Sequence, residues 1–419
     1  MTSPSTFHPP RAFRTRKEIE ANPYPRRGEL DSSNADRLLA ALPLGHRDWK
    51  RILACILVKH GREHGTRNKQ VSNQTMYERP RFLYRFFDDL HRQTIYVRLD
   101  PRCLGNRHVE AMIAIWAKRG LGAGTIANYL SVLRVFATWI GEDPAIVRSA
   151  AEYLGDDSAQ AHRRQVADED HSWIAAGIEL AGVLEQIRAI CPYVAIQTEC
   201  SRLFGLRPKE ARCLRPHEAV IPRERANPRD RDPNSLATHY LHLDQGTKGG
   251  RPRDQPIETE VEWELVRRAQ ALVRPGQHLG RPGYTLKQNT EHYYRVLRKV
   301  GITRDDLGVT AHGLRHEFAI EKYKQTAGVA APVRGGSAPD REVDRGARGK
   351  VSRLLGHARR QVTSAYLGSP RIALSSHKEA NQSDGAASSM VCNRPVGTAR
   401  STEELTSRHL HHFEDPRDS

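Results

Sequence analysis

Apolar residues recur at the spacing of one helix face along most of the chain, and only one short stretch alternates with the period of a strand. Between about residues 46 and 145 the helical pattern appears four times. Its apolar positions are Trp49, Ile52, Leu53, Ile56 and Leu57; Met76, Leu83, Phe86, Phe87 and Leu90; His108, Met112, Ile115 and Trp116; and Ile126, Leu130, Leu133, Ala137 and Ile140. We expect Pro80 near the first turn of the second helix, and Thr125 as the cap of the fourth. Four amphipathic helices without a strand pattern predict a compact helical domain.

The strand pattern lies in residues 236–258. Thr238 to Leu243 alternate apolar and polar residues, a Gly-rich turn containing Lys248 follows, and Arg251 to Ile257 complete a predicted β-hairpin. Helical patterns flank the hairpin on both sides. They cover Ile174–Ile190, Tyr193–Phe204, a segment starting at Pro208, Glu260–Val273 and Glu291–Val300. The predicted fold class is mainly α with a small antiparallel β-sheet.

Composition divides the chain into five parts. Residues 1–45 are rich in Pro, Arg and Ser, which predicts a flexible basic arm with room for a short helix near Ala35 to Leu42. The helical domain spans 46–145, a polar linker spans 146–172, and a second domain spans 173–372. Residues 373–419 predict a disordered tail, in which His409, His411 and His412 fit a solvated segment better than a metal site.

The charge of the chain indicates its partner. Lys and Arg number 66 against 49 Asp and Glu, giving a net charge of +17. Such a surplus favours nucleic acid over a merely basic protein surface, and an aromatic content of 6% disfavours a single-strand binder. The six cysteines form no CxxC pair, so we expect neither a thiolate metal site nor a disulfide framework. No long apolar run is present, which predicts a cytoplasmic, nucleoid-associated protein without membrane contact.

Three short motifs near the end of the second domain indicate phosphodiester chemistry. His312-Gly-Leu-Arg315 precedes Leu355-Gly-His357, and Tyr366 follows that histidine by nine residues. A phenol is a weak nucleophile near neutral pH because its ordinary pKa is about 10, and cations around the phosphate would help it. Other tyrosines, Tyr293, Tyr294 and Tyr323, lack this spacing from a Leu-Gly-His segment.

With two further elements, these motifs form an ordered series. Phe204 to Glu210 contains Arg207 at a helix break, and Lys248 occupies the hairpin tip. In this order the series resembles the tyrosine recombinase (phage integrase) family over residues 175–370, and the stretch His108 to Gly141 resembles integrases of mobile elements. The resemblance implies that 46–145 is a core-binding, DNA-binding domain and that 173–372 is a catalytic integrase domain.

The resemblance also implies a role for each motif residue. Arg207 and Arg315 match the two arginines that hold the scissile phosphate, a task suited to the rigid, permanently charged guanidinium fork. Tyr366 matches the nucleophile that forms a 3′-phosphotyrosyl link. Lys248 matches the lysine that protonates the departing 5′ oxygen, although Arg251 and Arg253 lie close to it in the sequence.

Three more residues complete the implied site. His312 matches a position used for proton transfer and phosphate contact, with His316 as its neighbour, and the HxxR spacing selects His312. His357 matches a donor to the phosphate, and its alternative is a helix cap. Glu210 matches an acidic position that supports the first arginine. No metal, nucleotide or other cofactor is implied, because the arginines supply the positive charge.

The implied activity is site-specific DNA recombination by a homo-tetramer on double-stranded DNA, with accessory DNA-bending or directionality factors as possible partners. Three alternatives stay open: a type IB topoisomerase, a hairpin-forming resolvase, and a catalytically inactive DNA-binding regulator. One departure from the family pattern is the Gly-, Ala-, Pro- and Arg-rich stretch 325–350, which we interpret as a basic surface insertion between two helices.

Overall fold

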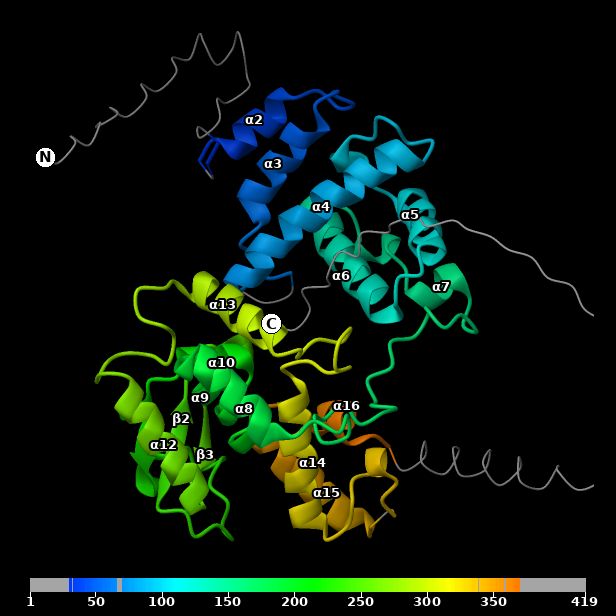
Figure 1. Cartoon of the computed structure of the whole chain (residues 1–419). Helices are drawn as coiled ribbons and strands as arrows, with labels where there is room; N and C mark the ends of the chain where they lie inside the picture. Colours follow the sequence, from blue (N-terminus) through cyan, green and yellow to red (C-terminus); the bar gives the residue numbers. More distant parts are fainter. Residues whose placement is uncertain (1–29, 32, 66–69, 338, 358, 370–419) are drawn as a thin grey trace, which may run out of the picture. The chain divides into compact units, whose positions relative to one another are not determined.

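The protein is described by a computed structural model over residues 30–31, 33–65, 70–337, 339–357 and 359–369. It is mainly helical with one three-stranded antiparallel sheet, which confirms the predicted fold class. The chain divides into two units, one ending at Arg164 and the other beginning at Gln165 (Figure 1). No helix within the described ranges is long and apolar enough to cross a membrane. The tail prediction and residues 1–29 of the arm lie outside the described residues.

The first unit is a bundle whose helices turn their apolar faces inward. Its helices are α2 (Ala35–Ala41), α3 (Trp49–His60), α4 (Asn73–Gln93), α5 (Asn106–Lys118), α6 (Ala123–Trp139) and α7 (Ala150–Leu154). Leu53, Phe87 and Leu130, from three different helices, are fully buried in one core. The four predicted helices are therefore confirmed.

Three expectations for this unit need correction. The fourth helix begins at Ala123 with Gly122 as its N-cap and no side-chain cap bond, so Thr125 is not the cap but a buried residue inside the first turn. The second begins at Asn73, capped by Ser72, so Pro80 lies well inside it. The short helix predicted near Ala35 to Leu42 is confirmed as α2, but this part of the chain is not a flexible arm, because α2 packs on α3 and Leu42 is part of the core.

The second unit combines helices with the sheet. The helices are α8 (Leu180–Ile190), α9 (Pro192–Leu203), α10 (Pro208–Cys213), α11 (Pro216–Ala219), α12 (Glu260–Leu272), α13 (Leu286–Lys299), α14 (Gly313–Ala327), α15 (Arg341–Leu354) and α16 (Ser364–Leu367). The strands are β1 (Val220–Pro222), β2 (His239–Leu243) and β3 (Arg253–Pro256), in the order β1-β2-β3. The predicted hairpin is confirmed, with Leu241 opposite Gln255.

Helix α14 lies at the centre of this unit, packed against α9, α15 and α16 (Figure 1). Leu314 faces one apolar cluster, while Phe318 and Tyr323 belong to another that also contains Tyr366. The same helix therefore connects the HxxR motif to the segment that carries the candidate nucleophile.

The structure also corrects three boundaries in this half of the chain. Residues 172–178 form turns around the buried Trp173, and α8 starts only at Leu180, after Glu179 caps it. The predicted linker 146–172 contains α7, which packs against α5. The stretch 325–350 is largely helical, because α14 extends to Ala327 and α15 starts at Arg341, where Asp340 caps it and Ala347 and Val351 anchor it in the core.

Candidate active site

The close packing around Gly313 explains why a glycine occupies this position of the HxxR motif. A Cβ atom at Gly313 would lie 2.6 Å from the carbonyl oxygen of His171 and 2.7 Å from the ring of Trp173. The indole of Trp173 donates a hydrogen bond to the carbonyl of Thr310, at 2.8 Å. Segment 171–173 therefore closes directly over the start of α14. Because residues three apart on a helix share a face, His312 and Arg315 point to the same side.

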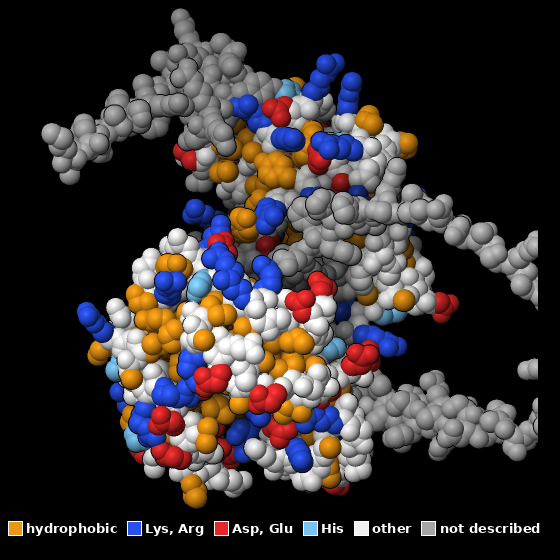
Figure 2. Space-filling view, in the orientation of Figure 1, with side chains coloured by type: hydrophobic (Ala, Val, Ile, Leu, Met, Phe, Trp, Pro, Cys, Tyr) orange, Lys and Arg blue, Asp and Glu red, His pale blue; other side chains and the backbone are white. Residues whose placement is uncertain are grey.

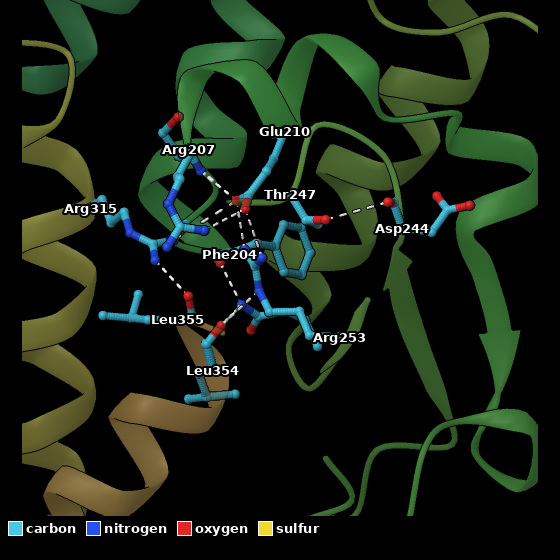
Figure 3. Close-up of polar contacts among 12 residues, drawn as sticks. Phe204, Arg207, Glu210, Asp244, Thr247, Arg253, Arg315, Leu354 and Leu355 are labelled. Atoms are coloured by element: carbon cyan, nitrogen blue, oxygen red, sulfur yellow. Dashed lines mark hydrogen bonds and ion pairs between the residues drawn. The ribbon is translucent and has the colours of Figure 1, made fainter. Parts of the chain in front are cut away.

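A single carboxylate organises the arginines of the site. Glu210, fully buried on α10, accepts a hydrogen bond from the backbone N–H of Arg207 at 2.8 Å and another from its guanidinium at 2.6 Å. Arg253 from β3 forms a bidentate pair with the same carboxylate, at 2.8 and 2.7 Å (Figure 3). Nη1 of Arg315 lies 3.9 Å from it. Glu210 thus binds all three guanidinium groups.

The charge on Glu210 is secured by this arrangement. Burial alone would raise the pKa of its carboxyl, but the charge of Arg253, its hydrogen bonds and the charges of Arg315 and Arg207 together lower that pKa well below the ordinary value. The carboxylate therefore stays ionised at any working pH and holds the arginines in fixed positions.

Tyr366 lies beside these groups. It is 6% exposed, its hydroxyl accepts a hydrogen bond from Nε of Arg315 at 3.3 Å, and the same oxygen lies 3.3 Å from Nε2 of His312. The ring centroid of His316 is 4.6 Å from that of Tyr366, and the centroid of His357 is 5.7 Å away. Motifs that are separated by 51 residues in sequence thus meet at one hydroxyl.

Arg315 is held on every side. Its side chain is fully buried, and besides Tyr366 it donates to the carbonyl oxygens of Gly205 and Leu355, the latter at 2.6 Å. Burial lowers the pKa of Arg315 to about 10, so the guanidinium remains charged near neutral pH. The polar atoms that fix it come from the break before α10 and from the Leu-Gly-His segment.

The histidines of the site are uncharged near neutral pH. Burial, and then the charge of Arg315, lower the pKa of His312 well below its ordinary value and that of His357 to about 3. Burial and His171 lower the pKa of His316 to about 4. Within the described residues, Nε2 of His357 is buried without a hydrogen-bond partner. A neutral imidazole can accept a proton from Tyr366, and His357 retains a free ring nitrogen.

These low pKa values predict a pH-dependent stability. In the folded state the pKa of His357 is below its ordinary 6.5, so the unfolded chain binds more protons, and stability is present above pH 6.5 and lost as the pH falls toward about 3. We expect the free energy of unfolding in urea to fall between about pH 7.5 and about pH 5, and to fall less in His357→Gln. Equal losses in the two proteins would contradict the neutral state of His357.

Lys248 lies at the exposed tip of the hairpin. It begins a short 3₁₀ turn, Lys248–Gly250, in which Gly249 has a φ of 76°. Its charge is one of those that lower the pKa of His357, and the described residues offer it no hydrogen bond or ion pair. Lys248 is therefore free to reach toward a bound substrate.

Arg253, unlike Lys248, is buried. Its side chain is 3% exposed and its nitrogens bond to Glu210 and to the carbonyl of Leu354, so it cannot replace Lys248 as a mobile proton donor. Sequence reasoning treated it only as a competitor for Lys248. The sequence around Arg251 and Arg253 gives no pattern that distinguishes a buried arginine from an exposed one.

A basic hollow adjoins His357. Its lining contains three exposed arginines and one acid, and the remaining residues are small: Arg345, Arg353, Arg360, Glu342, Gly346, Gly349 and Ser352. Elsewhere on the second unit, the face drawn in Figure 2 carries Lys and Arg side chains interspersed with Asp and Glu. The small residues of α15 leave space for a ligand to approach between the arginines. Among the described residues, no group of three His, Cys, Asp or Glu side chains could hold a metal ion.

Two family models match separate parts of the chain. A family model described as "Integrase" matches residues 163–321, and one described as "Phage integrase, N-terminal" matches residues 64–145. No curated protein matches the chain.

Solved structures with similarity to the chain include lambda integrase and a transposon integrase. A lambda integrase (75-356) dimer bound to a COC′ core site is 13% identical, with a TM-score of 0.46, covering 75% of this chain and 95% of that one. The Tn1549 transposon integrase with circular intermediate DNA is 15% identical, with a TM-score of 0.40, covering 78% and 98%. The two family matches together take in more than half of the sequence and the ordered motifs lie in the second unit, so the chain belongs to the phage integrase family of tyrosine recombinases.

Proposed function

We propose that the protein is a site-specific DNA recombinase that cleaves and rejoins double-stranded DNA through a covalent 3′-phosphotyrosyl intermediate. The observation that carries the proposal is the position of the Tyr366 hydroxyl, 3.3 Å from Nε of Arg315 and 3.3 Å from Nε2 of His312. The oxygen accepts from a cation on one side and faces a neutral imidazole on the other, as a nucleophile that must lose a proton requires.

Phosphate binding is the first step of the proposed reaction. Three guanidinium groups and the Glu210 carboxylate leave a surplus of two positive charges. That surplus matches the two negative charges that build up on a phosphodiester in its pentacoordinate transition state. Arg207 and Arg315 contact the phosphate oxygens, and His357 donates to them through its unpaired ring nitrogen.

Cleavage and rejoining follow as reverse steps. Tyr366 attacks phosphorus, its proton passes to His312, the bond to the 5′ oxygen breaks, and Lys248 protonates that oxygen. A 5′ hydroxyl then attacks the phosphotyrosine, Lys248 takes its proton, and Tyr366 regains a proton from His312. The covalent link conserves the energy of the phosphodiester, so we expect neither ATP nor a metal ion to be needed.

Recombination exchanges strands between two duplexes, so we expect four protomers on DNA at synapsis, and accessory DNA-bending or directionality factors belong to the same proposal. The DNA contacts would rest largely on phosphates. The hollow beside His357 continues from the active site, and we expect its arginines to bind phosphates next to the one that is cleaved.

The proposed activity is tested with a suicide substrate whose nick traps the cleaved strand. The wild-type protein is expected to form a protein–DNA adduct that resists denaturation and to leave a free 5′ hydroxyl on the other DNA end. The reaction should proceed in buffer that contains a metal chelator and no ATP. Absence of any adduct on the chain's own recombination site, or an adduct through a 5′ phosphate, would contradict the proposal. Relaxation of supercoiled plasmid lacking that site would instead favour a type IB topoisomerase.

The basic hollow yields a separate prediction about binding. Replacing Arg345 or Arg360 by Ala is expected to reduce the slope of log Kd against log salt concentration by about 1, because each arginine displaces roughly one counterion from DNA. Fluorescence anisotropy over a salt series measures the slope. Arg267→Ala is the control, since Arg267 lies on the exposed face of α12 and pairs with Glu260 and Glu264. Unchanged slopes in both test variants would place the DNA elsewhere.

A further inference from the structure

Arg253 contacts two parts of the active site that are far apart in sequence. On one side its two terminal nitrogens grip the Glu210 carboxylate, at 2.8 and 2.7 Å. On the other, its Nε donates to the carbonyl of Leu354 at 3.1 Å, across 101 residues of sequence (Figure 3). Leu354 ends α15, three residues before His357. One buried side chain therefore spans the distance from the arginine support to the histidine segment.

The pairing with Glu210 fixes the orientation of the carboxylate. A bidentate guanidinium pair is planar and directional, so Arg253 sets the plane in which both carboxylate oxygens lie. Oε1 then meets Nη1 of Arg207 and Oε2 meets the backbone N–H of Arg207. Arg207 keeps 16% of its side-chain surface exposed, whereas Glu210 and Arg253 are almost completely enclosed. Arg207 is thus the group that faces outward, and Arg253 lies behind it.

The glycine of the Leu-Gly-His segment provides a second observation for the contact between Arg253 and Leu354. Gly356 has a φ of +66°, and a Cβ atom there would lie 2.8 Å from Cδ of Arg253 and 3.2 Å from its Nη1. The glycine of the Leu-Gly-His segment is therefore needed where the arginine passes. Arg253 and Arg315 bind successive carbonyl oxygens of this segment, those of Leu354 and Leu355.

We propose that Arg253 is a positioning residue that fixes Arg207, through Glu210, in register with His357. The inference rests on the proposed function, because it concerns how Arg207 and His357 are held at the separation that allows both to contact the same phosphate. We assign Arg253 no contact with the substrate, because its nitrogens bond to Glu210 and Leu354, whereas Arg315 donates to the hydroxyl of the proposed nucleophile. A small displacement of either contact would lower the rate of cleavage more than the affinity for DNA.

The test compares single-turnover cleavage of a suicide substrate with the Kd for the same DNA, using the full chain. Arg253→Lys keeps the charge but loses the fork, and we expect cleavage to slow by roughly 10- to 100-fold while Kd stays within about threefold. Arg267→Lys, the exposed control with two glutamate partners, is expected to cleave at the wild-type rate. Wild-type cleavage by Arg253→Lys, or an equal loss in Kd and rate, would overturn the inference.

A double-mutant cycle separates positioning from general damage. The effects of Glu210→Gln and Arg253→Lys on the cleavage rate are expected to be non-additive. The double variant should cleave within about threefold of the rate of the slower single variant. Additive losses would overturn the inference. If Arg253→Lys shows no cooperative thermal unfolding, Glu210→Asp replaces it in the test, because it keeps the buried charge and shifts the carboxylate. Cleavage by Glu210→Asp at the wild-type rate would also overturn the inference. Failure of the wild-type protein to form an adduct would instead refute the proposed function.

Discussion

Tyr366→Phe is expected to bind DNA with wild-type affinity and to form no covalent adduct. The substitution removes the one oxygen that attacks phosphorus and leaves the ring, which packs beside His316 and His357, in place. Loss of a covalent nucleophile lowers a catalysed rate by at least roughly 10⁴-fold. The hydroxyl takes part in two hydrogen bonds, one with Arg315 and one with His312, so the free energy of unfolding should fall by about 2 kcal/mol. A denaturing gel with labelled suicide substrate measures the adduct.

Tyr293→Phe provides the matched control. Tyr293 is fully buried in the apolar cluster that also contains Trp173 and Leu314, and its ring lies against Tyr294 and the guanidinium of Arg212. This variant is expected to form adduct at the wild-type rate. Adduct formed by Tyr366→Phe, or lost in Tyr293→Phe with folding intact, would move the nucleophile to another tyrosine.

Arg315→Lys is expected to have the second largest effect. Nε, Nη1 and Nη2 of the guanidinium each contact a different acceptor, the Tyr366 hydroxyl, the Gly205 carbonyl and the Leu355 carbonyl, and the single nitrogen of a lysine cannot lie at all three positions. Arginines that stabilise transferring phosphoryl groups contribute roughly 10³- to 10⁵-fold, so single-turnover cleavage should fall by about 10³-fold or more. Leaving a buried carbonyl without its donor should also lower the free energy of unfolding by about 2 kcal/mol.

Rapid-quench cleavage and urea denaturation separate the two effects of Arg315→Lys. The catalytic loss is expected at temperatures where the variant is fully folded, and Arg267→Lys is expected to match the wild type in both measurements. A cleavage rate within about tenfold of the wild-type value would show that Arg315 is mainly a structural residue.

Much of the site could be predicted because its signals are local. The HxxR spacing places His312 and Arg315 on one face of a helix whatever surrounds it, and Pro208 at a first helical position marks the start of α10 after Arg207. The hairpin around Lys248 was visible because alternation and a Gly-rich turn are short-range features. The order of these motifs in the sequence carries the resemblance to the family, and that resemblance implies the role of each residue.

What the sequence hid depends on long-range packing. Trp173 interrupts a helical pattern because its indole bonds to Thr310, 137 residues away, and no local feature marks that contact. The helix α15 forms in a Gly- and Arg-rich stretch because Ala347 and Val351 reach a core made by α14. The burial of Arg253 likewise depends on Glu210, which lies 43 residues earlier. Propensity yields to tertiary contacts at each of these places.

Peptide mapping of the trapped protein–DNA adduct tests the central claim most directly. Trypsin cleavage after Arg360 and Arg371 releases residues 361–371, in which Tyr366 is the only tyrosine. After nuclease digestion, mass spectrometry is expected to find a nucleotide joined through its 3′ phosphate to Tyr366. A nucleotide on Tyr293, Tyr294, Tyr323 or any other residue, or a linkage through a 5′ phosphate, would contradict the account.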